Sequence, residues 1–191
     1  MDTRILVLVI AAVAVIIAVA ALLVMRRRKS GQLKQRFGTE YDRVVQQNGD
    51  AGRAEDILAE REKRVEKFSI RPLSAGDRER YEQQWALVQR LFVDDPSLAV
   101  TEADQLVTTV MGARGYPMVK FEQRAADISV NYPGVVQNYR SAREIVLRHG
   151  KGQSTTEDLR QAMVYFGSLF DELLDSPKPE TIGVSRERIA S

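Results

Sequence analysis

An uninterrupted apolar run near the start of the chain constrains its architecture more than any other feature. Residues Ile5 to Met25 include no charged or polar side chain. As a helix, these 21 residues would extend about 30 Å, which matches the hydrocarbon core of a bilayer. The run is followed at once by four cations, Arg26, Arg27, Arg28 and Lys29. This pattern predicts a transmembrane helix over residues 5–25, preceded by a short flank, residues 1–4.

A cleaved secretory signal is the alternative interpretation of the same run. The triplet Ala18-Val19-Ala20 has the small-residue pattern of a cleavage site. However, the run continues to Met25 and then meets the four cations, which is typical of a stop-transfer segment. A retained anchor is therefore the preferred interpretation, and a secreted or periplasmic binding protein is the alternative.

The cations that flank the run predict its orientation. The basic juxtamembrane segment, residues 26–36, carries six Lys and Arg residues, whereas the N-terminal flank has only Arg4 and the α-amino group. Because short loops rich in Lys and Arg stay in the cytoplasm, the N-terminus is expected outside and the C-terminal domain in the cytoplasm of a single-pass protein. Arg26, Arg27, Arg28 and Lys29 are also candidates for contact with anionic lipid head groups, a role compatible with setting the topology.

Charge is divided unevenly between the two parts of the chain. The whole chain has a net charge of +2, but residues 37–191 hold 25 anions and 21 cations, or about −4. An acidic domain without a basic helix does not favour nucleic-acid binding, so none is predicted. The absence of cysteine excludes disulfides, thiolate catalysis and cysteine-ligated metals.

Beyond the anchor, the apolar residues follow a helical period almost throughout, and alternation typical of strands is missing. The predicted fold is all-α: one N-terminal transmembrane helix followed by a soluble helical bundle of about five to six helices. Residues 37–68 are expected to form a polar stalk helix with a break at Asn48-Gly49-Asp50. The bundle is expected over residues 71–174 and a disordered tail over 175–191.

Capping residues mark three helix starts within the predicted bundle. They are Ser74 with Asp77, Asp95 followed by Pro96, and Ser154 with Glu157. Side-chain oxygens at these positions can accept hydrogen bonds from the free amide groups of a first helical turn. The only tryptophan, Trp85, follows the first of these starts and is interpreted as a core anchor.

Two features bear on self-association. The second half of the stalk segment has a narrow apolar stripe, and its opposite charges, such as Glu60 and Arg64, suggest a solvated polar face. The stripe does not keep a heptad repeat, which weakens a coiled-coil interpretation. Ala14 and Ala18 have the small-residue spacing of some transmembrane dimers, so a homodimer is an open alternative.

No residues with the pattern of a catalytic, cofactor or metal site are identified. His149 is the only histidine, and its expected place in a last helical turn suggests a helix-dipole partner. Without cysteine or a second histidine it does not predict a typical zinc site. A membrane-associated enzyme acting through carboxylates or His149 is the alternative to a non-catalytic domain.

Two tyrosine-proline turns supply the candidates for protein contact. Tyr116 and Tyr132 each precede a proline, so both are expected in turns, where they either display aromatic rings or pack on the bundle. With the anchor, they favour a membrane-anchored helical interaction or scaffold domain. Its predicted partners are the lipid bilayer and another protein.

Several stretches carry a resemblance to a known family. They are RFGTEYDRVV (36–45), RPLSAGDRERY (71–81), FVDDP (92–96), MGARGYP (111–117) and FEQRAADISVNYP (121–133). In this order and spacing, they resemble a family of uncharacterised bacterial single-span proteins that are labelled as membrane or secreted proteins. The resemblance implies a bacterial source and the same plan of an anchor followed by helices. It brings no catalytic residues, and the cationic flank argues against the secreted label.

Overall fold

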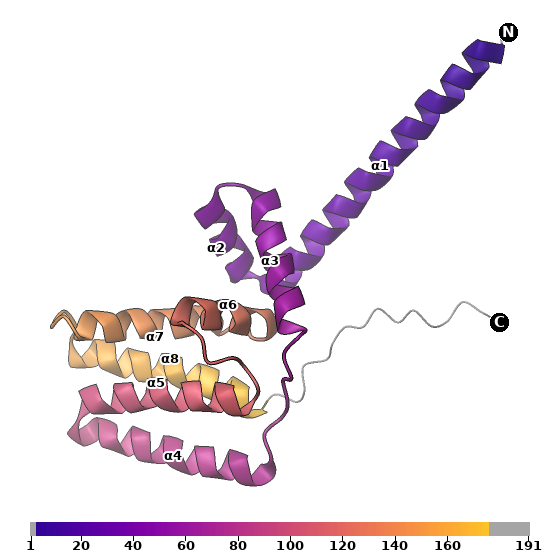
Figure 1. Cartoon of the computed structure of the whole chain (residues 1–191). Helices are drawn as coiled ribbons and strands as arrows, with labels where there is room; N and C mark the ends of the chain where they lie inside the picture. Colours follow the sequence, from indigo (N-terminus) through magenta and orange to yellow (C-terminus); the bar gives the residue numbers. More distant parts are fainter. Residues whose placement is uncertain (1–2, 176–191) are drawn as a thin grey trace. The chain divides into compact units, whose positions relative to one another are not determined.

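The computed structural model describes residues 3–175, with the side chains of residues 3–11, 14, 18, 22, 23 and 26 excepted. Every regular element in this part of the chain is an α-helix, which confirms the all-α class. The chain divides into two compact units, residues 1–58 and residues 59–191 (Figure 1). Each unit is described by itself.

The first unit begins with a long helix and a short one. Helix α1 (Thr3–Phe37) extends about 52 Å at 1.5 Å per residue, and α2 (Thr39–Asn48) follows it. Gly38 separates the two with φ 50° and ψ −125°, a conformation that suits glycine. This break was not predicted from the sequence.

The expected transmembrane segment, residues 5–25, lies within α1. Among the described residues, no helix combines the length and the apolar character needed to span a bilayer. The side chains of Ala14 and Ala18, on which a homodimer was argued, lie outside the described part. The expected tail is likewise outside it, since Asp175 ends the last helix and residues 176–191 are not described.

The expected stalk, residues 37–68, consists of two helices. The predicted break is confirmed: Gly49 ends α2 with φ 69°, and its amide donates to the Val45 carbonyl. Helix α3 (Ala51–Val65) follows, and the boundary between the two units falls inside it. Within the first unit, the Tyr41 hydroxyl on α2 donates to Glu55 Oε1 on α3 at 3.0 Å.

The solvated face predicted for the end of the stalk is wrong in part. Arg64 donates to Asp127 Oδ1 at 2.8 Å instead of pairing with Glu60, and Asp127 is only 2% exposed. Arg61 is also buried, and it donates to Ser129 Oγ at 3.3 Å. Both contacts lie within the second unit. These arginines are drawn from the solvated face by partners on another helix of that unit. Helical periodicity does not reveal such partners.

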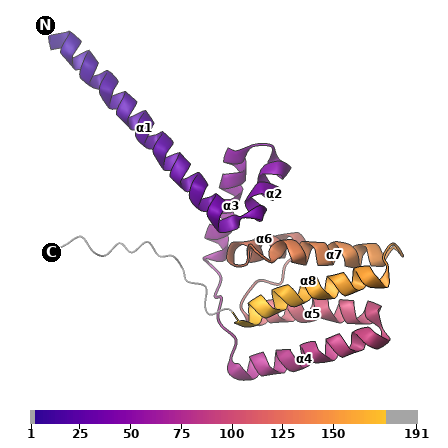
Figure 2. The same ribbon diagram turned by 180° about the vertical axis from the view of Figure 1, so that it is seen from behind.

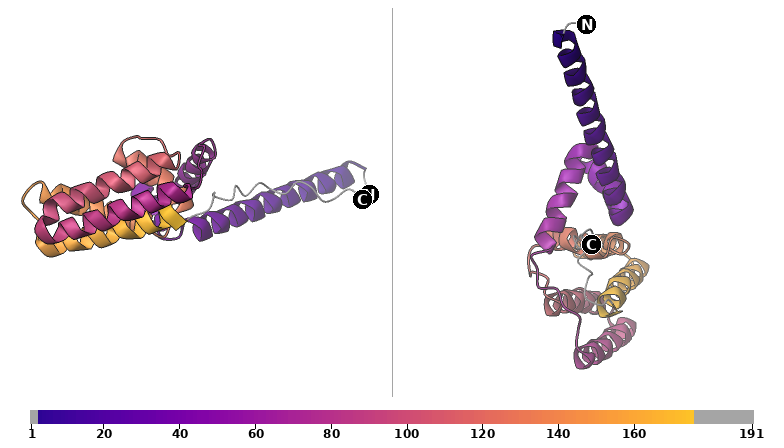
Figure 3. Two further views of the ribbon diagram at one scale, coloured as in Figure 1. Left: turned by 90° about the horizontal axis from the view of Figure 1, so that it is seen from below. Right: turned by 90° about the vertical axis from the view of Figure 1, so that its right-hand side faces the viewer.

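The second unit contains a bundle of five helices in the described part of the chain, in agreement with the expected number. They are α4 (Ala75–Asp94), α5 (Pro96–Ala113), α6 (Phe121–Asn131), α7 (Val136–His149) and α8 (Thr156–Asp175). Helices α5 and α8 lie in the middle, with α4 on one side and α6 and α7 on the other (Figures 2 and 3).

The core of this bundle is formed by apolar positions at helical spacing. Two groups of buried side chains dominate it: Ala103, Leu106, Val107, Val110 and Met111 on α5, and Leu159, Ala162, Met163, Phe166, Leu169, Phe170 and Leu173 on α8. Their spacing follows the helical period on which the all-α prediction rests.

Two of the three predicted caps are confirmed. Ser74 Oγ accepts from the Asp77 amide at 3.0 Å, and Asp95 Oδ1 accepts from the Leu98 amide at 2.9 Å. The third was placed one residue too early. Thr155, rather than Ser154, forms the capping box at the start of α8, with Asp158 as its partner. Ser154 Oγ instead contacts His149 Nδ1 at 2.8 Å.

The linker from α3 to α4 is held against the end of α5. The Arg71 amide donates to the Arg114 carbonyl at 2.9 Å. Arg114 is fully buried, and its Nη1 donates at 2.6 Å to the Leu173 carbonyl near the end of α8. Gly115 has φ 96°, and a β-carbon there would collide with the Ser69 carbonyl oxygen. These contacts fix the linker beside the first turns of α4.

Candidate functional site

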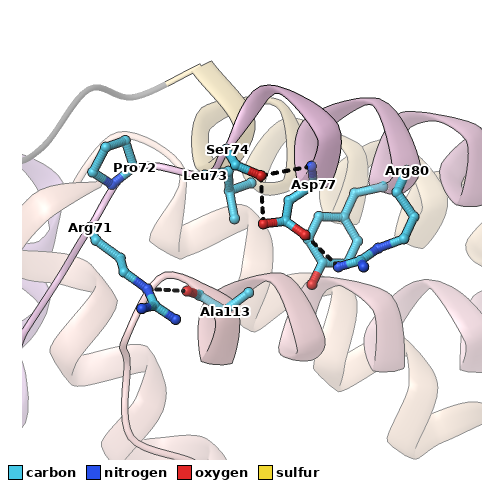
Figure 4. Close-up of a pocket in the computed structure, with 8 residues that line it drawn as sticks. Arg71, Pro72, Leu73, Ser74, Asp77, Arg80 and Ala113 are labelled. Atoms are coloured by element: carbon cyan, nitrogen blue, oxygen red, sulfur yellow. Dashed lines mark hydrogen bonds and ion pairs between the residues drawn. The ribbon is translucent and has the colours of Figure 1, made fainter.

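A pocket of about 460 Å³ lies where the linker meets α4 and α5 (Figure 4). We call it the α4 pocket. It is lined by the linker residues Arg71, Pro72, Leu73 and Ser74, by Asp77, Arg80 and Tyr81 of α4, and by Ala113 at the end of α5. Its volume lies within the range typical of small-molecule sites.

One wall of the α4 pocket is a row of polar groups that satisfy one another. The Ser74 hydroxyl donates to Asp77 Oδ2 at 2.8 Å, and Arg80 Nη2 donates to Asp77 Oδ1 at 2.8 Å. The Arg80 guanidinium also lies over the Tyr81 ring, 4.9 Å from its centroid. Figure 4 shows this row beside the first turn of α4.

Two other lining residues keep unused donors. Arg71 Nε donates to the Ala113 carbonyl at 3.2 Å, but no hydrogen bond or ion pair of the described residues uses its two terminal nitrogens. Tyr81 is 5% exposed, and its hydroxyl has no hydrogen-bond partner in the described part of the chain. That oxygen is not among the described polar atoms that are both buried and without a partner, so it is open to solvent. The α4 pocket therefore offers hydrogen-bond donors to a ligand.

A second concave surface, which we call the α4/α8 groove, has a volume of about 450 Å³. It is lined by Trp85, Gln89 and Phe92 of α4 and by Arg160, Met163, Val164, Gly167, Ser168 and Asp171 of α8. Its floor is apolar, and Val164 on its rim is 52% exposed. Leu87 and Val93 are also exposed on α4 but do not line the groove.

Trp85 forms part of the α4/α8 groove instead of being a buried core anchor. Its indole stacks on Phe170, with centroids 4.7 Å apart and planes inclined by 17°, but it keeps intermediate exposure. A β-carbon at Gly167 would lie only 3.2 Å from Trp85 Cζ2. Glycine at this position of α8 thus allows the indole to approach the helix backbone.

The two ends of the α4/α8 groove carry opposite charges. Arg160 forms a two-point ion pair with Glu157, with distances of 2.6 and 2.8 Å. Asp171 lies among the other lining residues, and desolvation together with the charge of Asp175 raises the pKa of its carboxyl. No described residue forms an ion pair with Asp171, so its carboxylate can receive a cation from a partner.

His149 contacts two serines from different elements. Its Nε2 lies 2.7 Å from Ser97 Oγ in the first turn of α5, and its Nδ1 lies 2.8 Å from Ser154 Oγ. The imidazole thus connects the end of α7 to the start of α5 and to the α7–α8 loop. A hydroxyl next to an imidazole is also the geometry of a nucleophile with its base, but the third group here is a neutral hydroxyl.

The candidate contact residues Tyr116 and Tyr132 lie in the interior, which is the second of the two arrangements considered from the sequence, packing on the bundle. They are 3% and 5% exposed, and Asn131 Nδ2 donates to the Tyr116 hydroxyl at 2.6 Å. Burial raises the pKa of Tyr116 far above its ordinary value, and Tyr132 beside it raises that pKa further. The structure shows that both rings are packed in the interior. Contact with a partner through them stays a prediction.

The structure also places charged residues in the interior that sequence reasoning missed. Asp104 on α5 pairs with Arg143 on α7 at 3.2 Å, while its Oδ1 atom is buried without a hydrogen-bond partner among the described residues. Burial raises the pKa of Asp104, although Arg143 and Arg124 oppose the shift. No spacing along the sequence indicates that α5 and α7 are neighbours.

The remaining expectations concern the cationic cluster and metals. Arg27, Arg28 and Lys29 are exposed on α1, and the side chain of Arg26 lies outside the described part. The structure does not bring them together with Tyr116 or Tyr132 in a single unit. Within the described residues, no group of three or more His, Asp or Glu side chains is placed to hold a metal ion.

The chain was compared with family models, with curated proteins and with solved structures, and none of them matches it.

Proposed function

We propose that this chain is a membrane-anchored, non-catalytic interaction domain that binds an amphipathic helix of another protein in the α4/α8 groove. The single observation that carries the docking part is the groove lined by the apolar side chains of Trp85 and its neighbours and by Asp171, whose carboxylate forms no ion pair with a described residue. Two adjacent helices with an apolar seam accept a third helix by the same packing that builds a bundle. The occupant is a helix whose apolar anchor residues are followed within a turn by Lys or Arg.

The anchor part of this proposal is supported by sequence. The 21 residues from Ile5 to Met25 carry no charged or polar side chain in the sequence, a pattern typical of a span, and the cations at 26–29 favour a cytoplasmic domain. The same cations would contact anionic head groups at that membrane surface. Membership of the single-span bacterial family that the sequence resembles is part of the same proposal.

A photo-crosslinking pair of variants tests the groove. A photoreactive amino acid replaces Val164, which is 52% exposed on the groove, or Leu147, which is 53% exposed on α7 and does not line it. In membranes of the source cell, we expect one adduct from position 164 and none from 147. Mass spectrometry should place the crosslink in an amphipathic helix with the predicted cation. Equal adducts at both positions, or a crosslink to residues 176–191 or to a second copy of the chain, would contradict the proposal.

A peptide with the crosslinked sequence then gives the quantitative test. It should change the fluorescence of Trp85, the only tryptophan, and should lose affinity about tenfold or more for Val164→Arg, which places a cation in the groove. Leu147→Arg adds the same charge elsewhere and should bind as wild type does. Equal weakening by both substitutions would show that the groove is not the docking site.

The contact between Ser97 and His149 favours a second candidate function, an acyl-transfer or hydrolytic enzyme. In that reaction Ser97 Oγ would attack an acyl carbon while its proton passes to His149 Nε2. The bond from the acyl carbon to its alcohol or amine leaving group would then break, and the imidazolium would give its proton to that leaving group, which leaves an acyl ester on Ser97 for water to hydrolyse. A fluorophosphonate probe should then label the wild type at Ser97 and fail to label His149→Ala. Absence of labelling in the wild type would exclude this candidate and leave His149 as a structural link.

A further inference from the structure

We propose that the α4 pocket binds a small organic carboxylate. This inference goes beyond the interaction role and does not depend on it, because the pocket lies at the first turns of α4 and shares no lining residue with the α4/α8 groove.

The carboxylate is expected to bind at Arg71. Arg71 Nε donates to the Ala113 carbonyl at 3.2 Å, which orients the guanidinium, and neither terminal nitrogen makes a hydrogen bond or ion pair with a described residue. A planar guanidinium with two open nitrogens matches the two oxygens of a carboxylate. Figure 4 shows Arg71 and Ala113 at one edge of the pocket and Asp77 and Arg80 at the other.

The second observation is the hydroxyl of Tyr81. Its side chain is 95% buried, it lines the pocket, and its hydroxyl has no partner in the described part of the chain. The hydroxyl oxygen is not among the described polar atoms that are both buried and without a partner, so it is open to solvent and can donate to a bound ligand in place of water. The side chains of Pro72 and Leu73 provide an apolar surface for the body of the ligand.

The charges of the lining favour a monoanion over a phosphate dianion. Two guanidinium groups, on Arg71 and Arg80, face one carboxylate, Asp77, which leaves one net positive charge. The Asp77 carboxylate lies at the same wall and would repel the second negative charge of a dianion. Arg80 is already paired with Asp77, so it is not free to offset that charge. The donors left open, on Arg71 and Tyr81, are also too few for the several oxygens of a phosphate group.

The test uses the full chain in lipid nanodiscs and follows binding by calorimetry at constant ionic strength. The probes are benzoate, propionate, dimethyl phosphate and inorganic phosphate, with chloride as the reference anion. We expect saturable binding of benzoate, weaker binding of propionate, which has less apolar surface, and none of either phosphate. Absence of saturable benzoate binding, or tighter binding of a phosphate probe, would overturn the assignment.

Variants of the two donors locate the bound carboxylate. Arg71→Gln should weaken benzoate binding about tenfold or more, since a charge-assisted two-point contact is lost. Tyr81→Phe removes only the hydroxyl and should weaken it several-fold while keeping the fold. Arg90→Gln, an exposed α4 residue outside the pocket, is the matched control and should bind as wild type does. Unchanged affinity in both pocket variants would place any benzoate site elsewhere.

Discussion

Trp85 on α4 stacks on Phe170 of α8 with ring centroids 4.7 Å apart, and the stacking depends on Gly167 one turn earlier on α8. A β-carbon at Gly167 would already lie 3.2 Å from the indole. The aromatic wall of the α4/α8 groove thus exists because one helical position lacks a side chain. The proposed docking surface can be tested through that position.

Gly167→Leu is expected to displace the indole from Phe170. The new side chain would need the space that Trp85 occupies, so we expect a loss of about 1–3 kcal/mol in the free energy of unfolding and a red-shifted emission of Trp85. Gly31→Leu is the control, because nothing lies within 4 Å of a β-carbon at Gly31 on α1. An unshifted emission spectrum in Gly167→Leu would show that the contact does not hold the indole.

Gly115→Ala is expected to destabilise the junction between the linker and α5. The substitution combines φ 96° with a collision between the new β-carbon and the Ser69 carbonyl oxygen, and we expect a loss of about 2 kcal/mol or more. Gly134→Ala meets nothing within 4 Å and should change stability by less than about 0.5 kcal/mol. Urea denaturation of both variants measures the difference, and equal stability of the two would contradict the geometry of this junction.

The two buried tyrosines are expected to respond differently to removal of their hydroxyls. Tyr116→Phe leaves Asn131 Nδ2 without its acceptor and should cost about 1–2 kcal/mol. Tyr132→Phe should stay within about 0.5 kcal/mol of wild type, because the Tyr132 hydroxyl is buried and makes no hydrogen bond of good geometry with any described residue. Thermal unfolding of both proteins gives the comparison, and a larger loss for Tyr132→Phe would reverse the assignment of the hydrogen bond.

We expect the contribution of Asp104 to the free energy of unfolding to fall as the pH rises. Its pKa is raised by burial, so the folded state prefers the neutral acid. The contribution of Asp104 is therefore most favourable below the ordinary aspartate pKa of about 3.9 and is lost as the pH rises through the raised value. Urea unfolding between about pH 3.5 and 6.5 should show wild type losing stability relative to Asp104→Asn.

Asp158 provides a control of opposite sign. Hydrogen bonds from the Thr155 amide and hydroxyl lower the pKa of Asp158, so its contribution is present above the ordinary pKa and is lost as the pH falls. Relative to Asp158→Asn, wild type should gain stability as the pH rises through the acid range. The same slope in both comparisons would mean that general charge effects, not these two sites, set the pH dependence.

The local features of this fold could be predicted from the sequence because their causes are local. Asp95 and Pro96 start α5, Gly49 ends α2, and Ser74 caps α4, each through groups within four residues of itself. The buried face of α8 also follows from spacing alone. The shift of the last cap from Ser154 to Thr155 has a tertiary cause, since Ser154 Oγ contacts His149.

The candidate sites could not be predicted, because they depend on which helices are neighbours. From the sequence alone, Trp85 is interpreted as a core anchor. Its place in the groove depends on Gly167 of α8, and the sequence does not show that these two residues are neighbours. The open donors of Arg71 and Tyr81 matter only when the linker is held at the end of α5. For Tyr116 and Tyr132 the turns left display or packing open, and the bundle buries both rings.

Protease accessibility of the C-terminal domain tests the central claim, that the domain is anchored in the membrane and works in the cytoplasm. The full chain, with an epitope tag after residue 191, is treated with protease in intact cells and in inside-out membrane vesicles. We expect the tagged domain to be protected in cells, to be digested in vesicles and to sediment with the membranes. Digestion from outside intact cells, or release of the domain into the medium, would contradict it.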